Sequence, residues 1–294
     1  MKLLVAESET PDERAQRRAA AGKSSGETYA ATLRDLAPGA TVTVIQPADD
    51  DAPCHTPADL RASDAVFLTG SPLHVYDDTP EVRRQLAFMR AVIAAGTPSF
   101  GSCAGLQVAV AAAGGRVRRM PRRMEAGVAR RIVATDAGRD HPLLAGRAPS
   151  WDAAAIHGDE VDSLPPGATL LAGNGVTRVQ AIELRHDAGI FWGVQYHPEL
   201  ALGEIAVALR RQAADLVDAG LADDEAAVCD QADRLSALHR EPDRRALRWA
   251  LGVDGEFADE AGRRREIVNF LAALPTLDGR GAAAGRRPAM ALRP

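Results

Sequence analysis

The sequence has 294 residues, which is enough chain for about two domains and for a full core without disulfide bonds. Its net charge of -5 and its aromatic content of 4% argue against a protein that binds nucleic acid or an anionic membrane surface. The three cysteines lie far apart, without the spacing of a zinc site or of a disulfide framework. We therefore predict a cytoplasmic globular protein that binds no metal, cofactor, nucleic acid or membrane.

Short apolar runs alternate with helical segments in the first two thirds of the sequence. Four of these runs are predicted as buried strands: Leu3–Ala6, Val42–Ile45, Ala65–Leu68 and Pro98–Gly101. A helix between the last two runs is bounded by Thr79 as a cap, Pro80 in the first turn and Gly96 as a stop. This alternation predicts a parallel sheet with helices on both faces. A second set of predicted strands comprises Val128–Ala134, Thr169–Ala172, Val179–Leu184 and Ile190–Tyr196.

The sequence changes character after about Gly203, where helical patterns replace strands. The three predicted helices are Asp223–Leu238, Pro242–Leu251 and Ala258–Leu274, the last ended by Pro275. An amphipathic stripe on the third helix indicates that it packs against another surface. We divide the chain into an α/β domain at 1–205, a helical extension at 206–278 and a disordered tail at 279–294. The extension could dock on the α/β domain, form a homodimer or bind a partner protein.

The strongest local signal is the segment Gly101–Gln107, where a buried strand is followed directly by a helix-like run. Cys103 lies at the junction, which is the arrangement of a nucleophile elbow with cysteine in place of serine. The positive end of the helix dipole favours a thiolate there, and the backbone N–H of Ala104 points to where an oxyanion develops. The alternative is a structural cysteine buried in a tight turn between strand and helix.

Two further segments supply groups that a cysteine nucleophile needs. In Gly193–Glu199, the side chains of His197 and Glu199 are two residues apart and face the same side of an extended backbone. They have the chemistry of a base and its orienting carboxylate, and a surface His-Pro-Glu turn is the alternative. The segment Leu68–Pro72 forms a Gly-Ser-Pro turn after a buried strand, so its backbone N–H groups either complete an oxyanion hole or belong to a plain loop.

Together these segments resemble the class I glutamine amidotransferases, most closely the amidotransferase domain of GMP synthetase and its free-standing relatives. Gly101–Gln107 fits the family's Gly-x-Cys-x-Gly-x-Gln, and Gly193–Glu199 fits its Gly-x-Gln-x-His-Pro-Glu. Thr69–Pro72 resembles the oxyanion loop, and Glu125–Gly127 and Ile156–Val161 resemble two further family segments in the same order. The resemblance covers the α/β domain and implies a flavodoxin-like, doubly wound, mostly parallel sheet.

The resemblance also implies a role for each matching residue. Cys103 attacks the side-chain amide of glutamine to form a γ-glutamyl thioester, while His197, oriented by Glu199, takes and returns the proton. The implied oxyanion-hole residues are Gly70, Ser71 and Ala104. The implied substrate-binding residues are Gln107, Gly127, Val128, His157 and Asp159, and the last two are alternatively supports of the sheet edge.

Three functions are compatible with the sequence. The first is a glutaminase that supplies ammonia to a separate synthase or ligase, because the nucleotide loop of GMP synthetase is absent from this sequence. The second is hydrolysis or transfer of another γ-glutamyl amide or peptide, because Ala104 and Leu106 depart from the bulky residue and the histidine usual in the family's elbow. The third is a non-catalytic binding or regulatory module on the same fold, for which the helical extension is the motivation.

Overall fold

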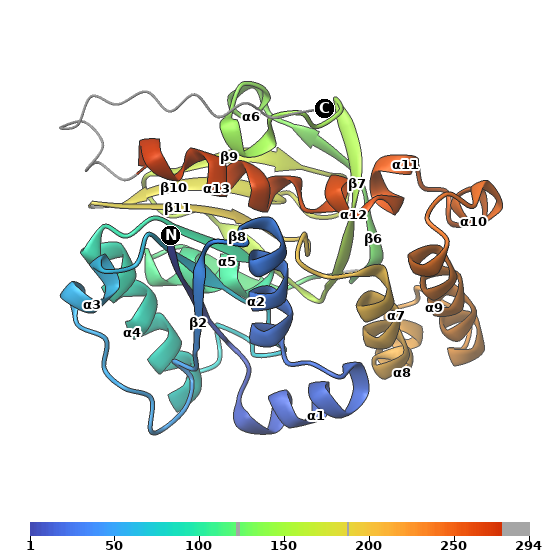
Figure 1. Cartoon of the computed structure of the whole chain (residues 1–294). Helices are drawn as coiled ribbons and strands as arrows, with labels where there is room; N and C mark the ends of the chain where they lie inside the picture. Colours follow the sequence, from blue (N-terminus) through green and yellow to red (C-terminus); the bar gives the residue numbers. More distant parts are fainter. Residues whose placement is uncertain (122–123, 187, 278–294) are drawn as a thin grey trace.

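A nine-stranded sheet forms the centre of the computed structural model, which describes residues 1–121, 124–186 and 188–277 (Figure 1). The strand order is β2-β1-β3-β4-β11-β10-β9-β6-β7. These strands are β1 (Lys2–Ala6), β2 (Thr41–Ile45), β3 (Ala65–Leu68), β4 (Ser99–Ser102), β6 (Glu125–Ala134), β7 (Ser150–His157), β9 (Ala168–Gly173), β10 (Ala181–His186) and β11 (Gly189–Val194). A separate antiparallel pair consists of β5 (Arg116–Arg119) and β8 (Asp159–Ser163).

The sheet is parallel from β2 to β11 and antiparallel from β11 to β7. Each of the eight predicted strands overlaps an observed strand of this sheet. The predicted strand at Ile190–Tyr196 ends earlier, at Val194, because the chain bends at Gln195 and Tyr196. The prediction did not include β5, β7 or β8. The doubly wound α/β architecture is confirmed.

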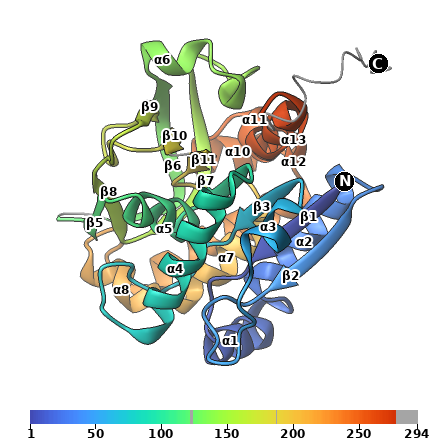
Figure 2. The ribbon, with the colours of Figure 1, turned by 90° about the vertical axis from the view of Figure 1, so that its left-hand side faces the viewer.

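Helices cover both faces of the sheet because successive side chains of its buried strands point to opposite sides (Figure 2). In β1, Leu3 and Val5 face one core cluster, whereas Leu4 and Ala6 face the other. The first cluster is covered by α2 (Ser25–Leu36) and α13 (Arg265–Leu277), and the second by α3 (Pro57–Arg61), α4 (Pro80–Ala95) and α5 (Ala104–Ala112). The other helices are α1 (Pro11–Ala21), α6 (Asp136–Arg139), the 3₁₀ helix η1 (Pro142–Leu144), α7 (Leu202–Arg211), α8 (Ala213–Asp218), α9 (Glu225–Arg240), α10 (Arg245–Leu251), α11 (Gly255–Ala258) and α12 (Glu260–Arg263).

The helical extension packs directly on the sheet. Helices α7 and α9 form a third apolar cluster against β6 and β7. At the end of the extension, the ring of Phe270 in α13 lies 5.4 Å from Phe67, 5.5 Å from Phe100 and 5.7 Å from Trp192, measured between ring centroids. The predicted domain boundary at residue 205 falls within α7, and the predicted tail at 279–294 lies outside the described residues.

The prediction of one helix over Ala258–Leu274 is wrong, because this segment is broken into α11, α12 and α13. The carboxylate of Asp259 accepts a hydrogen bond from the backbone N–H of Gly262 and starts a new helix after α11. Pro275 does not end α13, which continues to Leu277. A proline in the last turn removes only one backbone donor and is tolerated there when the helix is held by packing.

None of the helices within residues 1–121, 124–186 and 188–277 combines the length and the apolar character needed to cross a membrane.

Replacing Gly105 by alanine is expected to lower the free energy of unfolding by about 2–4 kcal/mol. A β-carbon at Gly105 would lie 2.4 Å from the carbonyl oxygen of Leu68, so α5 would have to move away from β3. Chemical denaturation measures the change. Gly39→Ala is the matched control, because a β-carbon at Gly39 meets no atom within 4 Å. Equal stability of the two variants would contradict the close packing of α5 on β3.

Candidate active site

The topology of the sheet brings three separate segments to one edge. Strands β3, β4 and β11 are parallel neighbours, with Leu68 in register with Gly101, and Ser102 in register with Val194. Their carboxyl ends therefore lie side by side. The chain continues from these ends into Gly70 and Ser71, into Cys103, and into His197 and Glu199. The carboxyl edge of a parallel sheet is where such folds bind ligands, so the predicted catalytic residues meet at a suitable place.

Cys103 occupies a strained turn between β4 and α5. Its φ of 52° and ψ of -112° lie outside the regions that non-glycine residues commonly adopt. The turn is held by a hydrogen bond of 2.9 Å from the backbone N–H of Cys103 to the carbonyl oxygen of Val194. The Cys103 side chain is 7% exposed, and its Sγ lies 3.9 Å from the carbonyl oxygen of Ile156. This conformation places the thiol at the N-terminus of α5, where the helix dipole stabilises negative charge.

His197 and Glu199 form a buried pair beside Cys103. The Nδ1 atom of His197 lies 2.8 Å from Oε1 of Glu199. The His197 ring also packs over Gly70, where a β-carbon would lie 2.9 Å from its Cε1 atom, so a residue without a side chain is needed at this position. Burial lowers the pKa of His197, but Glu199 and Cys103 outweigh this effect and raise the pKa to about 10. The site therefore favours the protonated imidazole of His197 beside the Glu199 carboxylate.

Helix α2 supports Glu199 from behind. The hydroxyl of Thr32 donates a hydrogen bond of 3.2 Å to the carbonyl oxygen of Glu199. One turn earlier, the fully buried hydroxyl of Tyr29 lies close enough to Glu199 and Ser102 for both to affect its pKa, which burial and the Glu199 charge raise well above its ordinary value. The carboxylate that orients His197 is therefore enclosed by protein and shielded from bulk water.

The predicted oxyanion-hole residues lie around the thiol. Gly70 and Ser71 line the same cavity as Cys103, and Ala104 begins α5, whose first N–H groups have no acceptor inside the helix. The hydroxyl of Thr69 donates a 3.0 Å hydrogen bond to the carbonyl oxygen of Gly70 and accepts one from the backbone N–H of Ser8. These bonds fix the peptide of Gly70 relative to the sheet, which favours a preorganised site.

Asp159 connects the loop after β3 to the opposite wall of the cavity. Its carboxylate lies 2.5 Å from Nδ1 of His74 and accepts a 3.0 Å hydrogen bond from the hydroxyl of Tyr76. The rings of His74 and Tyr76 stack, and burial together with the hydrogen bond to Asp159 raises the pKa of Tyr76 to about 12. The sequence reveals no partner for His74. Its partner lies 85 residues away, and no local pattern indicates a contact over such a separation.

Gln107 and His157 are held by the same part of the chain. The side-chain amide of Gln107 donates a 3.1 Å hydrogen bond to the backbone carbonyl of Asp159. His157 lies 2.9 Å from that carbonyl through Nδ1 and 3.2 Å from the carboxylate of Glu125 through Nε2. Glu125 also accepts hydrogen bonds from Asn174 and Gln180. His157 thus belongs to a buried network between strands, although its side chain also reaches the cavity wall.

Two of the predicted substrate-binding residues are not brought to the cavity. Gly127 has a φ of +78°, and a β-carbon there would point at Leu209 and Leu235 of the helical extension. Val128 packs against the apolar cluster formed by α7 and α9. The structure therefore places both residues under the extension, and neither lines the cavity next to Cys103.

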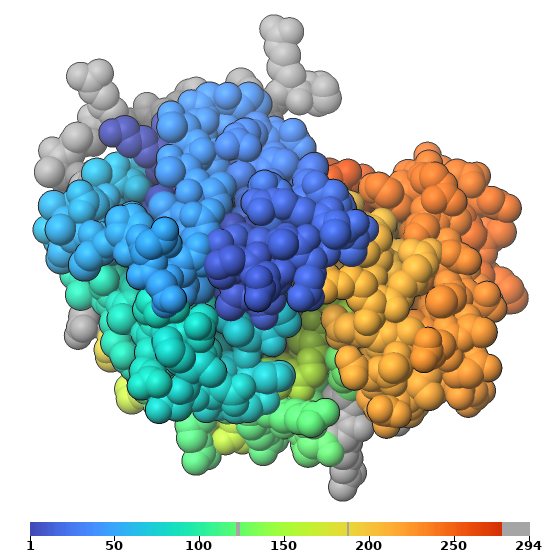
Figure 3. Space-filling model, turned by 90° about the horizontal axis from the view of Figure 1, so that it is seen from below, coloured from blue at the N-terminus to red at the C-terminus, as the bar shows by residue number. Residues whose placement is uncertain are grey.

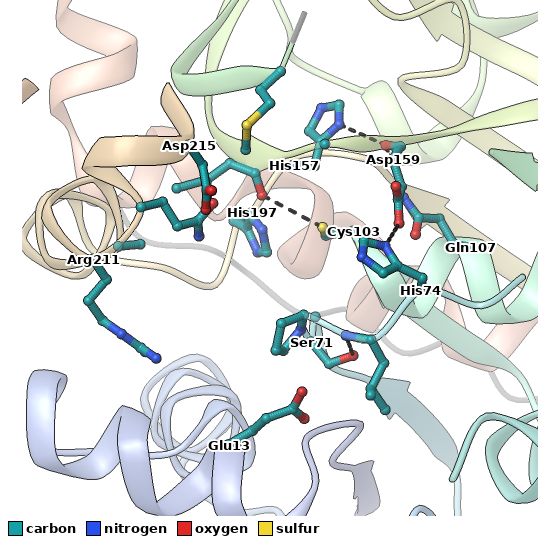
Figure 4. Close-up of a pocket in the computed structure, with 18 of the residues that line it drawn as sticks. Glu13, Ser71, His74, Cys103, Gln107, His157, Asp159, His197, Arg211 and Asp215 are labelled. Carbon is teal, nitrogen blue, oxygen red and sulfur yellow. Dashed lines mark hydrogen bonds and ion pairs between the residues drawn. The ribbon is translucent and has the colours of Figure 1, made fainter. Parts of the chain in front are cut away.

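One cavity of about 1120 Å³ contains Cys103, His197 and Glu199 (Figure 4). Its walls come from the β3–α4 loop, α5, the turn between β7 and β8, and residues 119–121 and 124. Helix α1 and helices α7 and α8 line its other end. In Figure 3, the N-terminal segments, the α4 region and the helical extension surround a recess on this face. Among the described residues, no group of three His, Cys, Asp or Glu side chains is arranged to hold a metal ion.

Loss of the Asp159 side chain is expected to lower kcat/KM for a γ-glutamyl amide by about 10- to 100-fold. Asp159→Ala removes the carboxylate that pairs with His74 and Tyr76. The loop that carries Gly70 and Ser71 then loses its side-chain contacts with β8 on the opposite wall of the cavity. Steady-state kinetics and hydrogen exchange of residues 69–78 measure this loss. Asp162→Ala is the control, because Asp162 lies on the same strand and pairs only at the surface with Arg116 and Arg118. Unchanged kinetics and loop protection in Asp159→Ala would overturn the role of this tie.

A family comparison agrees with this geometry. The model of the family "Glutamine amidotransferase class-I" matches residues 21–214. A gamma-glutamyl-L-1-hydroxyisopropylamide hydrolase from a Pseudomonas species is 35% identical over 225 residues, covering 75% of this chain and 75% of that protein. A glutamine-hydrolysing GMP synthase subunit from Ignicoccus hospitalis is 34% identical over 144 residues, covering 49% of this chain and 71% of that protein. The GMP synthase of Thermomicrobium roseum is 36% identical over 137 residues, which are only 23% of its length.

Solved structures share the fold. A glutamine amidotransferase from Thermotoga maritima has a TM-score of 0.59 and 15% identity, covering 85% of this chain and 98% of that chain. A glutamine amidotransferase from Methylobacillus flagellatus has a TM-score of 0.54 and 20% identity, covering 92% of this chain and 94% of that chain. With the family match, these findings define an amide-hydrolysing enzyme built on the doubly wound fold. The chain belongs to the class I glutamine amidotransferase family.

Proposed function

We propose that the chain hydrolyses the γ-amide bond of a γ-glutamyl compound, with Cys103 as nucleophile, His197 as general acid and base, and Glu199 as the orienting carboxylate. The observation that carries this proposal is their convergence in one cavity. Cys103 occupies an elbow at a helix N-terminus, and beside it the buried His197–Glu199 pair is separated by 2.8 Å. A buried cysteine in a plain turn needs no such histidine, so the arrangement supports catalysis more than a structural role.

The proposed reaction has two halves. The thiolate of Cys103 attacks the γ-carbonyl carbon, and the N–H groups of Gly70, Ser71 and Ala104 stabilise the oxyanion. The C–N bond then breaks as the imidazolium of His197 donates its proton to the leaving nitrogen, which yields a γ-glutamyl thioester and a free amine. Water attacks the thioester, His197 accepts a proton from it, and the C–S bond breaks to give glutamate and the original thiolate. The proposed reaction requires no cofactor, because Cys103, His197 and water account for every bond and proton in it.

Two substrates are compatible with this chemistry. With free glutamine the amine is ammonia, which would pass to a separate synthase or ligase, and the likeness to GMP synthases supports this assignment. With an N-substituted γ-glutamyl amide the product is an alkylamine, and no partner is required. The Pseudomonas hydrolase supports this second assignment, because it matches the chain over three quarters of both lengths. The extent of the cavity beyond His197 supports it as well, so we favour the N-substituted amide.

Glutamate release from glutamine and from γ-glutamyl ethylamide tests the proposed function. We expect turnover of at least one of them, together with covalent labelling of Cys103 by a glutamine-like electrophile. Cys103→Ala should prevent both. Absence of turnover and of labelling in the intact chain would instead favour a non-catalytic binding module. Turnover of glutamine alone would favour the ammonia-supplying assignment.

A further inference from the structure

The position of His197 defines the side of the cavity on which the leaving group lies. A general acid must reach the nitrogen atom that departs, so any substituent on that nitrogen extends from Cys103 past His197. Gln107, Asp159 and His74 lie on the other side of Cys103 in Figure 4. The γ-glutamyl part of the substrate therefore occupies the side of the cavity that contains Gln107 and Asp159. The substituent on the nitrogen occupies the side beyond His197.

The cavity beyond His197 is walled by helices from two distant parts of the chain. Helices α7 and α8, together with the residue that joins them, contribute Ala208, Arg211, Gln212 and Asp215, and α1 contributes Glu13 from the opposite wall. In Figure 4, Arg211 and Asp215 lie on the His197 side, and Glu13 extends toward the cavity from below. Together with the buried Leu200, these residues form a space with an apolar base and a polar mouth.

The polar side chains that α7, α8 and the residue between them place at this mouth do not contribute contacts that stabilise the fold. In the part of the chain that the structure describes, the side chains of Arg211, Gln212 and Asp215 have no hydrogen bond or ion pair. By contrast, Arg210 next to them pairs with Asp233 of α9. Helix α7 thus directs Arg210 toward α9. Among the described residues, the neighbouring Arg211 has no such partner and lies at the cavity.

We propose that the part of the cavity beyond His197 is a leaving-group subsite, in which Leu200 and Ala208 contact the alkyl part of a γ-glutamyl N-alkylamide and Gln212 and Asp215 bind a polar end of the substituent. This inference rests on the proposed function. It gives the helical extension a direct part in substrate choice, because α7 and α8 supply most of the subsite.

The charges around the mouth select among substituents. Arg17 lies 3.9 Å from Glu9 and 3.4 Å from Glu204, so its charge is offset by these two carboxylates. Among the described residues at this end of the cavity, the carboxylates of Glu13, Asp215 and Asp218 then outnumber the one remaining guanidinium, that of Arg211, because Arg119 belongs to the wall formed by residues 119–121. A substituent that is neutral or cationic is favoured in this field, and one that carries a carboxylate is disfavoured. The departing amine itself becomes an alkylammonium ion at neutral pH, so the same carboxylates also favour its exit.

A set of size-matched substrates tests the subsite. The substrates are γ-glutamyl-propylamide, γ-glutamyl-(2-aminoethyl)amide and γ-glutamylglycine, with glutamine as the unsubstituted reference. We expect kcat/KM for the neutral and cationic amides to exceed that for γ-glutamylglycine and that for glutamine by at least tenfold. Asp215→Asn combined with Asp218→Asn should reduce the preference for the cationic amide over γ-glutamylglycine at least fivefold. Both residues are exposed, so the fold should tolerate the changes.

Asp230→Asn is the matched control, because this exposed carboxylate lies on α9 and does not line the cavity. It should leave the ratio of the two kcat/KM values unchanged. Equal kcat/KM for all four compounds, or an unchanged ratio in the double variant, would overturn the subsite while hydrolysis by Cys103 still stood. No turnover of any compound and no labelling of Cys103 would overturn the proposed function and the subsite together.

Discussion

Replacing Cys103 by alanine is expected to lower kcat for γ-glutamyl amide hydrolysis by roughly 10⁴-fold or more. The thiol is the only group in the proposed reaction that forms a covalent bond to the substrate, so no neighbouring side chain can replace it. The remaining binding groups of the cavity should still hold the substrate. We therefore expect the variant to bind a γ-glutamyl amide, as calorimetry can measure, without releasing glutamate.

Two other cysteines provide the matched controls. Cys54 and Cys229 are free and exposed, whereas Cys103 is buried. Cys54→Ala and Cys229→Ala should retain the kcat of the unaltered protein within twofold and should still be labelled by an electrophilic glutamine analogue. If Cys103→Ala kept more than about a hundredth of the original kcat, the covalent mechanism would have to be abandoned.

Replacing Glu199 by glutamine is expected to reduce kcat by roughly 10²- to 10⁴-fold and to change its pH dependence. Burial lowers the pKa of His197, and Glu199 is the largest of the influences that raise it to about 10. Because this value lies above the ordinary value of 6.5, His197 stays protonated across the neutral range and loses its proton only as the pH approaches 10. The alkaline limb of kcat/KM should therefore lie near pH 10, and Glu199→Gln should move it at least one pH unit lower.

The same shift affects stability. The pKa of His197 is raised in the folded state, so its contribution to stability is fully present below about pH 6.5 and is lost as the pH rises toward 10. Glu183→Gln is the control, because Glu183 pairs with His141 at 3.3 Å away from the cavity. It should lower stability and leave the pH profile of kcat/KM in place. An identical profile in Glu199→Gln and the unaltered protein would contradict the role of Glu199.

The strands that carry the candidate site could be predicted because their signals are local. β3 and β11 are mostly apolar, β4 is a short buried run, and the segments after all three strands match short motifs. The roles of Cys103 and His197 stay predictions, although the structure brings them together. The division of the chain at residue 205 also stays a prediction.

The three strands that the prediction did not include, β5, β7 and β8, have no comparable local signal in the sequence. β5 contains Arg-Val-Arg-Arg, β8 contains Asp-Glu-Val-Asp-Ser, and β7 is rich in alanine, so none has the β-branched or aromatic composition of a typical strand. They form strands because their neighbours offer pairing partners and an apolar surface. The cavity wall built by α1 and α8 could not be predicted either, because it depends on how two helices far apart in the sequence are placed.

The position of α13 has a consequence for the synthesis of the protein on the ribosome. A nascent chain that has already produced every catalytic motif, up to Glu199, still lacks the helix that covers Phe67, Phe100 and Trp192. These rings stay open to water, and to other unfinished chains, until Phe270 has been synthesised. The catalytic unit therefore completes its core only after α13 has been synthesised, and a chain arrested before that point would be prone to aggregate.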